Sequence, residues 1–307
     1  MKKIYFAIAI ALISVANSFA QQDPHYTQYM YNMNVINPAY AGSKEHLSFG
    51  LLYRKQWVDV SGAPSTGTFS GHSPVGKNVG LGLSAVTDKI GPVNETNVYA
   101  DFSYTLKLGG EHRLALGLKA GATFHKVGLF DDIGNGYVPD PGDPAFSQNI
   151  SRTYFNVGTG VFYYTQKYYV AFSVPNMLKS KHLDFDGVNY GSEVSHYFLT
   201  GGYVFEIGDN FKLKPSFMVK SAFGVDPSID GSLNALFFDK FEIGATYRVG
   251  DSFGGMVNYA ITPSIKIGYA YDHITSDLKV TTPASHEFML LFDLNFPKKV
   301  SRSPRYF

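Results

Sequence analysis

The stretch HRLALGLKAGATFHK, residues 112–126, decides the fold. Its leucines, alanines and phenylalanine occupy every second position from Leu114 to Phe124, and the positions between them carry Arg113, Lys119, His125, glycine, alanine and threonine. Successive side chains of a β-strand point to opposite faces, so this alternation predicts a strand with one apolar and one polar face. The stretch 97–108 alternates in the same way.

A soluble β-sandwich and a membrane barrel both contain such strands, and three observations favour the barrel. The predicted strands run mostly to ten or twelve residues, the length that a tilted membrane strand needs. Their polar face is rich in small and charged residues, as in a barrel interior. Aromatic residues crowd around short polar turns, as in residues 163–169 (YYTQKYY), which is typical of the aromatic girdle at a membrane interface.

Strand signals continue almost to the end of the chain, and the connections between them alternate between short and long. This rhythm is typical of outer-membrane barrels, and an even strand count places both termini in the periplasm. We therefore predict an all-β fold, a single antiparallel transmembrane β-barrel of about 14 strands with periplasmic N- and C-termini. The candidate strands are 48–57, 65–71, 78–87, 97–108, 112–125, 153–164, 168–174, 193–206, 211–222, 230–238, 241–249, 253–262, 264–272 and 286–296.

Two of these strands are weakly indicated, so a count of twelve stays open. The stretch 65–71 is rich in serine, threonine and glycine and has no clear apolar face, and 168–174 is short. Pro215 lies in the middle of a predicted strand, where its missing N–H removes a ladder hydrogen bond, and we expect a β-bulge there.

The beginning of the chain predicts a cleaved signal peptide over residues 1–20. Lys2 and Lys3 are followed by an apolar run over 4–15, too short to span a bilayer, and by the small-x-small sequence Ser18-Phe19-Ala20. The predicted organisation is then a periplasmic or lumenal segment over 21–46, the barrel over 47–296 and a periplasmic tail over 297–307. The chain has no cysteine, which excludes a lipoprotein anchor, disulfides and thiolate metal sites.

The remaining composition argues against an enzyme and against nucleic acid as a partner. Lys and Arg number 26 against 25 Asp and Glu, so no long-range field attracts nucleic acid. The G-x-G-x-x-A sequence at 80–85 is not followed by a helix that could face a pyrophosphate, and we interpret its glycines as inward-facing wall residues. No nucleophile and base pattern and no closely spaced histidines occur, so we expect no catalytic residue, metal or cofactor.

Charged residues fall on the polar faces of the predicted strands and are expected to face the lumen. They would pair across the interior and give a polar, largely plugged barrel; the alternative is an open pore that favours anions. The candidate lumen charges are Arg54, Asp101, Arg113, Lys119, Lys212, Lys214, Glu242, Arg248, Lys266 and Asp272, with Lys220, Glu287 and Asp293 on the same faces.

The stretch before the first strand carries too many aromatic residues for a disordered tail, and we interpret it as a plug or a partner-binding strip. Its sequences 23–29 (DPHYTQY) and 37–43 (NPAYAGS) closely resemble the mature start of the PorP/SprF family of type IX secretion outer-membrane proteins. Residues 54–57 (RKQW), 62–64 (GAP) and 88–92 (DKIGP) resemble its next landmarks, and 303–307 (SPRYF) resembles its terminus. Loop 126–152 matches no family feature.

The resemblance implies a non-enzymatic outer-membrane component of the type IX secretion and gliding machinery of Bacteroidota. Such barrels bind other secretion components in the periplasm or outer membrane, or help to export and display a large adhesin, with outer-membrane lipid around them. The candidate partner-binding residues are Tyr26, Tyr29, Tyr31, Asn37, Pro38, Tyr40, Arg305, Tyr306 and Phe307. The alternative is a substrate channel similar to the fatty-acid transporters, whose N-terminal hatch also has an Asn-Pro-Ala element.

Overall fold

A computed structural model of the chain describes residues 24–44, 46–128, 149–178, 184–185, 188–189, 195–223, 225–276 and 284–294. The predicted signal peptide and the C-terminal residues Arg305, Tyr306 and Phe307 lie outside the described residues. Helical structure is confined here to three single turns, η1 (Tyr29–Tyr31), α2 (Met33–Ile36) and η2 (Pro38–Tyr40). None of these turns has the length or the apolar character that a membrane-spanning helix requires.

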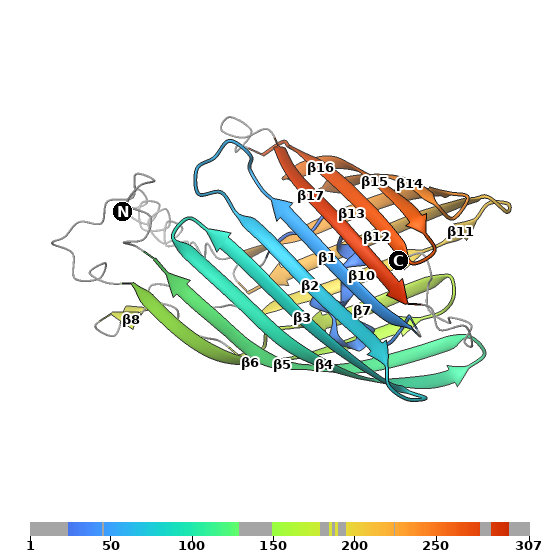
Figure 1. The fold of residues 1–307 in the computed structure, drawn as a ribbon, viewed down its shortest axis with the longest axis horizontal. Coiled ribbons are helices and arrows are strands. Elements are labelled where there is room, and N and C mark those ends of the chain that lie inside the picture. The colour runs from blue at the N-terminus through green and yellow to red at the C-terminus, as the bar shows by residue number, and fades with distance from the viewer. Residues whose placement is uncertain are drawn as a thin grey trace, which may run out of the picture.

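The strands form a single antiparallel barrel (Figure 1). Neighbours in the chain are neighbours in the sheet, and the pairings of β1 with β17 and of β10 with β12 close it. The barrel strands are β1 (Leu47–Lys55), β2 (Ser65–Pro74), β3 (Val79–Ile90), β4 (Val93–Gly109), β5 (His112–Val127), β6 (Ile150–Tyr164), β7 (Tyr168–Val174), β10 (His196–Tyr203), β11 (Phe205–Glu206), β12 (Phe211–Ala222), β13 (Val225–Phe237), β14 (Phe241–Arg248), β15 (Ser252–Thr262), β16 (Ile265–Ile274) and β17 (Ala284–Leu294).

Because β11 continues β10 against the same partner strand, β12, the described barrel has fourteen strands. The predicted barrel class is confirmed, and the alternative of twelve strands is wrong. The two doubtful stretches are both strands: 168–174 has the predicted bounds, and 65–71 extends to Pro74. A separate pair, β8 (Asp184–Phe185) and β9 (Val188–Asn189), lies in the connection from β7 to β10.

The expected bulge at Pro215 is wrong. β12 pairs with β13 in unbroken register through Pro215, and the register shift in that pair lies between Lys220 and Ala222. The irregularity opposite Pro215 is in the neighbouring strand, because β10 ends at Tyr203 and β11 begins at Phe205. The intervening Val204 donates its N–H to the carbonyl of Lys167 at 2.7 Å. A gap in the partner ladder therefore accommodates the missing N–H.

The two ends of the barrel differ. At one end, where β1 begins and β17 ends, every connection between strands has two to four residues; we call it the short-turn end. At the other, the long-loop end, the connections include 56–64, 128–149, 175–195 and 275–283. The pairing of Leu47 with Leu294 places the start of the first strand and the end of the last strand side by side at the short-turn end.

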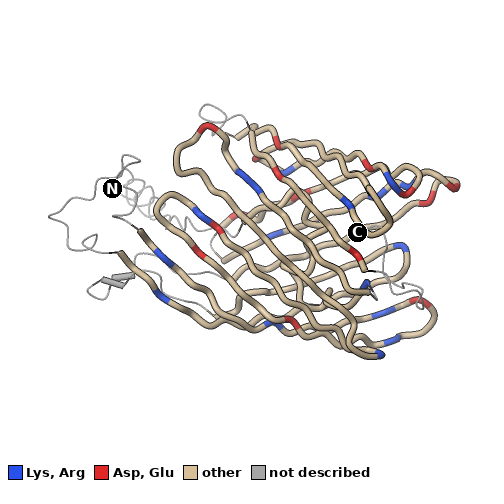
Figure 2. The backbone as a smooth tube through the Cα atoms, in the orientation of Figure 1, with Lys and Arg blue, Asp and Glu red and all other residues tan. Residues whose placement is uncertain are grey.

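The wall is apolar outside and polar inside. In β5, Leu116 and Leu118 are 46% and 62% exposed, while Lys119 and Thr123, which lie on the opposite face of the strand, are buried. A soluble sandwich would bury the leucines and expose the lysine. The reverse arrangement suits a wall whose outer face meets lipid and whose inner face meets polar groups. Figure 2 shows acidic and basic residues interspersed along the wall, with neither sign gathered in one region.

Candidate functional site

Residues 24–44 lie inside the barrel, and we call this segment the plug. Tyr29 and Met30 are completely buried, and Met33 and Ile36 nearly so. These plug residues form one hydrophobic cluster with wall residues that face inward, such as Phe162. The N-terminal segment therefore fills the lumen where these plug residues contact the wall.

The plug begins near the long-loop end. The backbone N–H groups of Thr27 and Gln28 both donate to the carboxylate of Glu287, at 2.9 and 2.8 Å. Arg54, the cross-strand partner of Glu287, donates to the hydroxyl of Thr27 at 2.8 Å. Arg54 is the penultimate residue of β1, at its long-loop end. His25 lies at this level too, with its Nε2 3.0 Å from the ammonium of Lys220.

The middle of the plug is fixed by tyrosine hydroxyls. Tyr31 donates to the carboxylate of Glu242 and accepts from the Lys214 ammonium at 2.7 Å. Tyr29 contacts the hydroxyl of Ser216 at 3.1 Å.

The last part of the plug crosses to the short-turn end. The Asn37 amide donates to the carbonyl of Val161 at 3.0 Å, and its oxygen accepts from the N–H of Ala39. The N–H of Gly42 donates to His72 at 3.1 Å. Lys44 lies 3.6 Å from the carboxylate of Asp293, the penultimate residue of β17. The plug therefore runs through the lumen from one end of the barrel to the other.

Glycines on the inner wall allow the plug backbone to approach closely. A Cβ built on Gly117 would lie 2.5 Å from Ala39 Cα, and one on Gly80 would lie 2.6 Å from the carbonyl carbon of Ala41. Both distances are too short for real Cβ contacts, so only glycine fits beneath this backbone. Three further inner-wall glycines meet the plug side chains of Asn34, Asn37 and Gln28: Gly82, Gly160 and Gly268. The inward orientation expected for the glycines at 80 and 82 is what the structure shows.

The predicted lumen charges are paired within the wall. Arg54 bridges Asp272 at 2.7 Å and Glu287 at 3.2 Å. The other buried wall pairs are Lys119 with Asp101 at 2.9 Å, Lys214 with Glu242 at 2.9 Å, and Arg248 with Asp230 at 2.7 Å. Each pair joins residues of different strands, so the polar interior holds the wall together as well as the plug.

Three predicted lumen charges have other surroundings. Arg113 is buried but donates to the carbonyls of Gly110 and His112, so it braces the β4–β5 turn. Lys212 pairs with Asp239 at the short-turn end. Lys266 is half-buried, with its ammonium 4.8 Å from the ring centre of Tyr31.

The predicted partner-binding residues of the plug face the wall. Tyr26, Tyr29, Tyr31, Asn37, Pro38 and Tyr40 are all buried. Sequence reasoning did not single out Asp230, Thr27, Gln28 or the glycines of β5, β6 and β16. The glycines of β5 and β6 lie on the same polar face as Lys119 and Asn156. Glycines at inward positions of a strand indicate that another backbone lies close to the wall there.

The lumen is filled by packed side chains of plug and wall. Among the described residues no three His, Asp or Glu side chains gather in a way that could hold a metal ion. A small cavity of about 60 Å³ between plug and wall is lined by Tyr26, Ile36, Tyr99, Lys119 and others. The site is a packed lumen.

Comparison with solved structures supports the architecture. The monoaromatic hydrocarbon channel CymD is 13% identical over 88% of this chain and 93% of its own, with a TM-score of 0.52. The toluene transporter TbuX of Ralstonia pickettii is 11% identical over 84% of this chain and 92% of its own, with a TM-score of 0.50. At these identities the similarity shows the fold alone, that of an outer-membrane barrel.

No curated protein matches the chain. The model of one protein family matches residues 18–292, and its description is type IX secretion system membrane protein PorP/SprF. This match covers the plug and nearly the whole barrel, and the predicted outer-membrane location agrees with it. The chain belongs to the PorP/SprF family of type IX secretion system membrane proteins.

Proposed function

We propose that this barrel is a closed, non-enzymatic component of the type IX secretion and gliding machinery, which supports export or surface display by binding other components or cargo. The observation that carries the proposal is the plug, which runs through the whole lumen and is bonded to the wall at both ends. A barrel built around a fixed segment is suited to binding partners at its ends, whereas a conduit needs an open path.

The same proposal includes an orientation. Short turns face the periplasm and long loops face outward in outer-membrane barrels, so the short-turn end is the periplasmic end. Periplasmic machinery would then meet the short turns and the tail 297–307, and a large adhesin would meet the long loops. The buried plug tyrosines serve partners indirectly, by keeping the plug docked in the lumen.

A substrate channel is the second candidate, favoured by the fold shared with CymD and TbuX, a channel and a transporter by name. Against it stands the wall around the plug, whose inner face is charged where a hydrocarbon path needs an apolar lining. Arg54, Lys119 and Lys214 are all buried in ion pairs along that path.

Two measurements separate the candidates. We expect the wild-type protein in planar bilayers to show no large stable conductance steps and a variant lacking 24–43 to show them. Affinity purification of the wild type from outer membrane, followed by mass spectrometry, should recover other secretion components or a large adhesin. Large stable steps in the wild type, together with a barrel that purifies alone, would refute the proposal and support a channel.

The deletion also tests the part that the plug plays in partner binding. A matched deletion of 297–307 removes the predicted periplasmic tail and should leave conductance closed while reducing the recovery of periplasmic partners. If neither deletion changes the recovered partners, although both barrels insert, the partner surfaces assigned above are wrong.

A further inference from the structure

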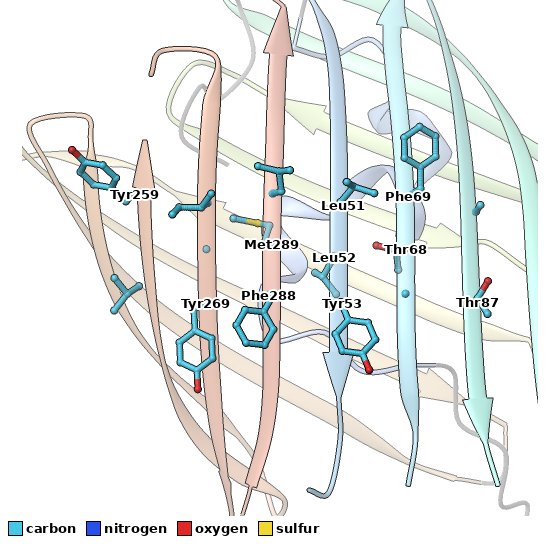
Figure 3. A pocket seen from close by; sticks show the side chains of 16 residues that line it. Leu51, Leu52, Tyr53, Thr68, Phe69, Thr87, Tyr259, Tyr269, Phe288 and Met289 are labelled. Atoms are coloured by element: carbon cyan, nitrogen blue, oxygen red, sulfur yellow. The ribbon is translucent and has the colours of Figure 1, made fainter. Parts of the chain in front are cut away.

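The outer wall has an apolar depression that is separate from the plug and the lumen. It has a volume of about 900 Å³ and extends across β15, β16, β17, β1, β2 and β3, on either side of the strand pair that closes the barrel (Figure 3). Its lining is almost entirely apolar and includes Leu51, Tyr53, Phe69, Tyr269 and Phe288. These side chains are exposed on the face that meets lipid.

The depression is centred on β2, the strand whose sequence over residues 65–71 has no clear apolar face. The outward residues of β2 are Ser65, Gly67, Phe69, Gly71 and Ser73, so Phe69 is its one large outward side chain. A Cβ built on Gly67 would meet nothing within 4 Å. The cross-strand partner of Gly67 on β3 is Thr87, and on β1 it is Tyr53. The wall is thus thin at Gly67 and bounded by aromatic rings.

The outward lining residues form two rows across the strands, and the row nearer the long-loop end lies next to a basic row. The row farther from the long-loop end is Ile267, Leu290, Leu51, Phe69 and Ala85. The nearer row is Tyr269, Phe288, Tyr53, Gly67 and Thr87, each the cross-strand partner of the next. Two residues nearer the long-loop end, the same pairings give the row Tyr271, His286, Lys55, Ser65 and Lys89. Lys55 and Lys89 are two strands apart, about 10 Å between their backbones.

Both lysines are placed for an anionic group at the rim. Lys89 is exposed, and Lys55 is half-buried and donates one hydrogen to the carbonyl of Ala63 at 3.2 Å. Asp88, the acidic neighbour of Lys89, lies on the other face of β3 and accepts from Thr66. An apolar groove in the hydrocarbon layer with two cations at one end matches an amphiphile with acyl chains and a phosphate head.

We propose that this groove binds a phosphorylated, multiply acylated lipid of the outer leaflet, lipid A, with its chains in the apolar groove over Gly67 and a phosphate at Lys55 and Lys89. The choice of leaflet rests on the orientation proposed above, because the basic row lies toward the long-loop end. The site lies on the outer wall and needs neither the plug nor any secretion partner.

The test uses the full-length protein in nanodiscs that contain lipid A, phosphatidylglycerol and phosphatidylethanolamine, with the lipid retained after release measured by native mass spectrometry. The Lys55→Gln, Lys89→Gln double variant removes the charges, and Gly67→Trp fills the groove. Lys107→Gln with Lys240→Gln, exposed lysines toward the short-turn end, and Gly231→Trp, on an outward position of β13 with open space, are matched controls.

Wild type and both controls should retain lipid A in preference to the other two lipids. Loss of the two lysines should weaken retention about 30-fold, at about fivefold per lysine. Gly67→Trp should abolish the preference, with heat-modifiable mobility in gels showing that the barrel is folded. The proposal is overturned if wild type retains no excess of lipid A, if phosphatidylglycerol takes its place, or if targeted and control variants behave alike. None of these results depends on conductance or on recovered partners, which test the closed-barrel function.

Discussion

Alanine in place of Gly117 should loosen the plug from the wall. The new Cβ would lie 2.5 Å from both Ala39 Cα and the carbonyl carbon of Pro38. The Ala39 nitrogen would lie closer still, and ordinary contact begins at 3.4 Å, so the plug backbone must withdraw by more than 1 Å. Gly117 has no positive φ, so alanine adds no backbone strain of its own. The cost falls on the contact between plug and wall.

The size of the effect follows from overpacking. Forcing an additional group into a packed interior costs about 1–3 kcal/mol. If that cost acts on docking, the fraction of barrels with the plug released rises about 5- to 150-fold, at a factor of ten for each 1.4 kcal/mol. Single-channel recordings measure this fraction directly, because a released plug opens the lumen for as long as it stays released.

The control is Gly231→Ala on the outer wall, where a Cβ meets nothing within 4 Å. We expect it to behave as wild type in both conductance and heat-modifiable mobility. The reasoning is refuted if Gly117→Ala opens no more often than this control while the barrel is folded. A plug that did not lie against β5 would give this same absence of opening, so the experiment tests the contact between Gly117 and Ala39 directly.

Further predictions concern charge, pH and topology. Arg54→Ala should lower stability by about 3–5 kcal/mol in denaturant titrations, because it leaves Asp272 and Glu287 buried without a cation, whereas Lys167→Ala at an exposed pair should change it by less than about 1 kcal/mol. Burial and the nearby Lys220 lower the pKa of His25, so the docking stability that His25 contributes is full above about pH 6.5 and decreases as the pH falls. Acidification should therefore release the plug, measured as conductance, and this release should disappear in His25→Gln. Release that persists in His25→Gln would exclude His25 as its cause. Because the chain lacks cysteine, Pro24→Cys and Asp209→Cys can be labelled singly with an impermeant maleimide; intact cells should label the first and only permeabilised cells the second, and the opposite result would reverse the orientation.

The barrel could be predicted from the sequence because its signal is local. Alternation at every second residue, as in residues 112–126, needs no knowledge of what the strand pairs with. Most of the predicted strands agree with the structure to within a few residues for this reason. The failure at Pro215 is not local: the gap that accommodates it lies in another strand, at Val204, and nothing in the sequence of β12 indicates it.

The path of the plug could not be predicted for the same reason. Residues 24–44 mix aromatic, amide and small side chains without a helical or strand period, so no local pattern gives their direction. Their course depends on groups distant in the chain, such as Glu287 near Thr27 and Gly117 beneath Ala39. Sequence reasoning found the inward charges, but only the fold shows that Asp230 is the partner of Arg248.

From the division of charge between wall and plug, we expect the barrel to stay folded when the plug is removed. Lys44 is the one lysine, and no aspartate, glutamate or arginine occurs, within residues 24–44. The buried ion pairs of Arg54, Lys119, Lys214 and Arg248 all join wall residue to wall residue. Loss of the plug therefore leaves every one of these charges with its partner and exposes it to water, which lowers its desolvation cost. Docking then depends on close packing against glycine, on hydrogen bonds and on the ion pair of Lys44 with Asp293. A substitution at a glycine contact, such as Gly117→Ala, therefore tests docking without removing a charged side chain or its partner.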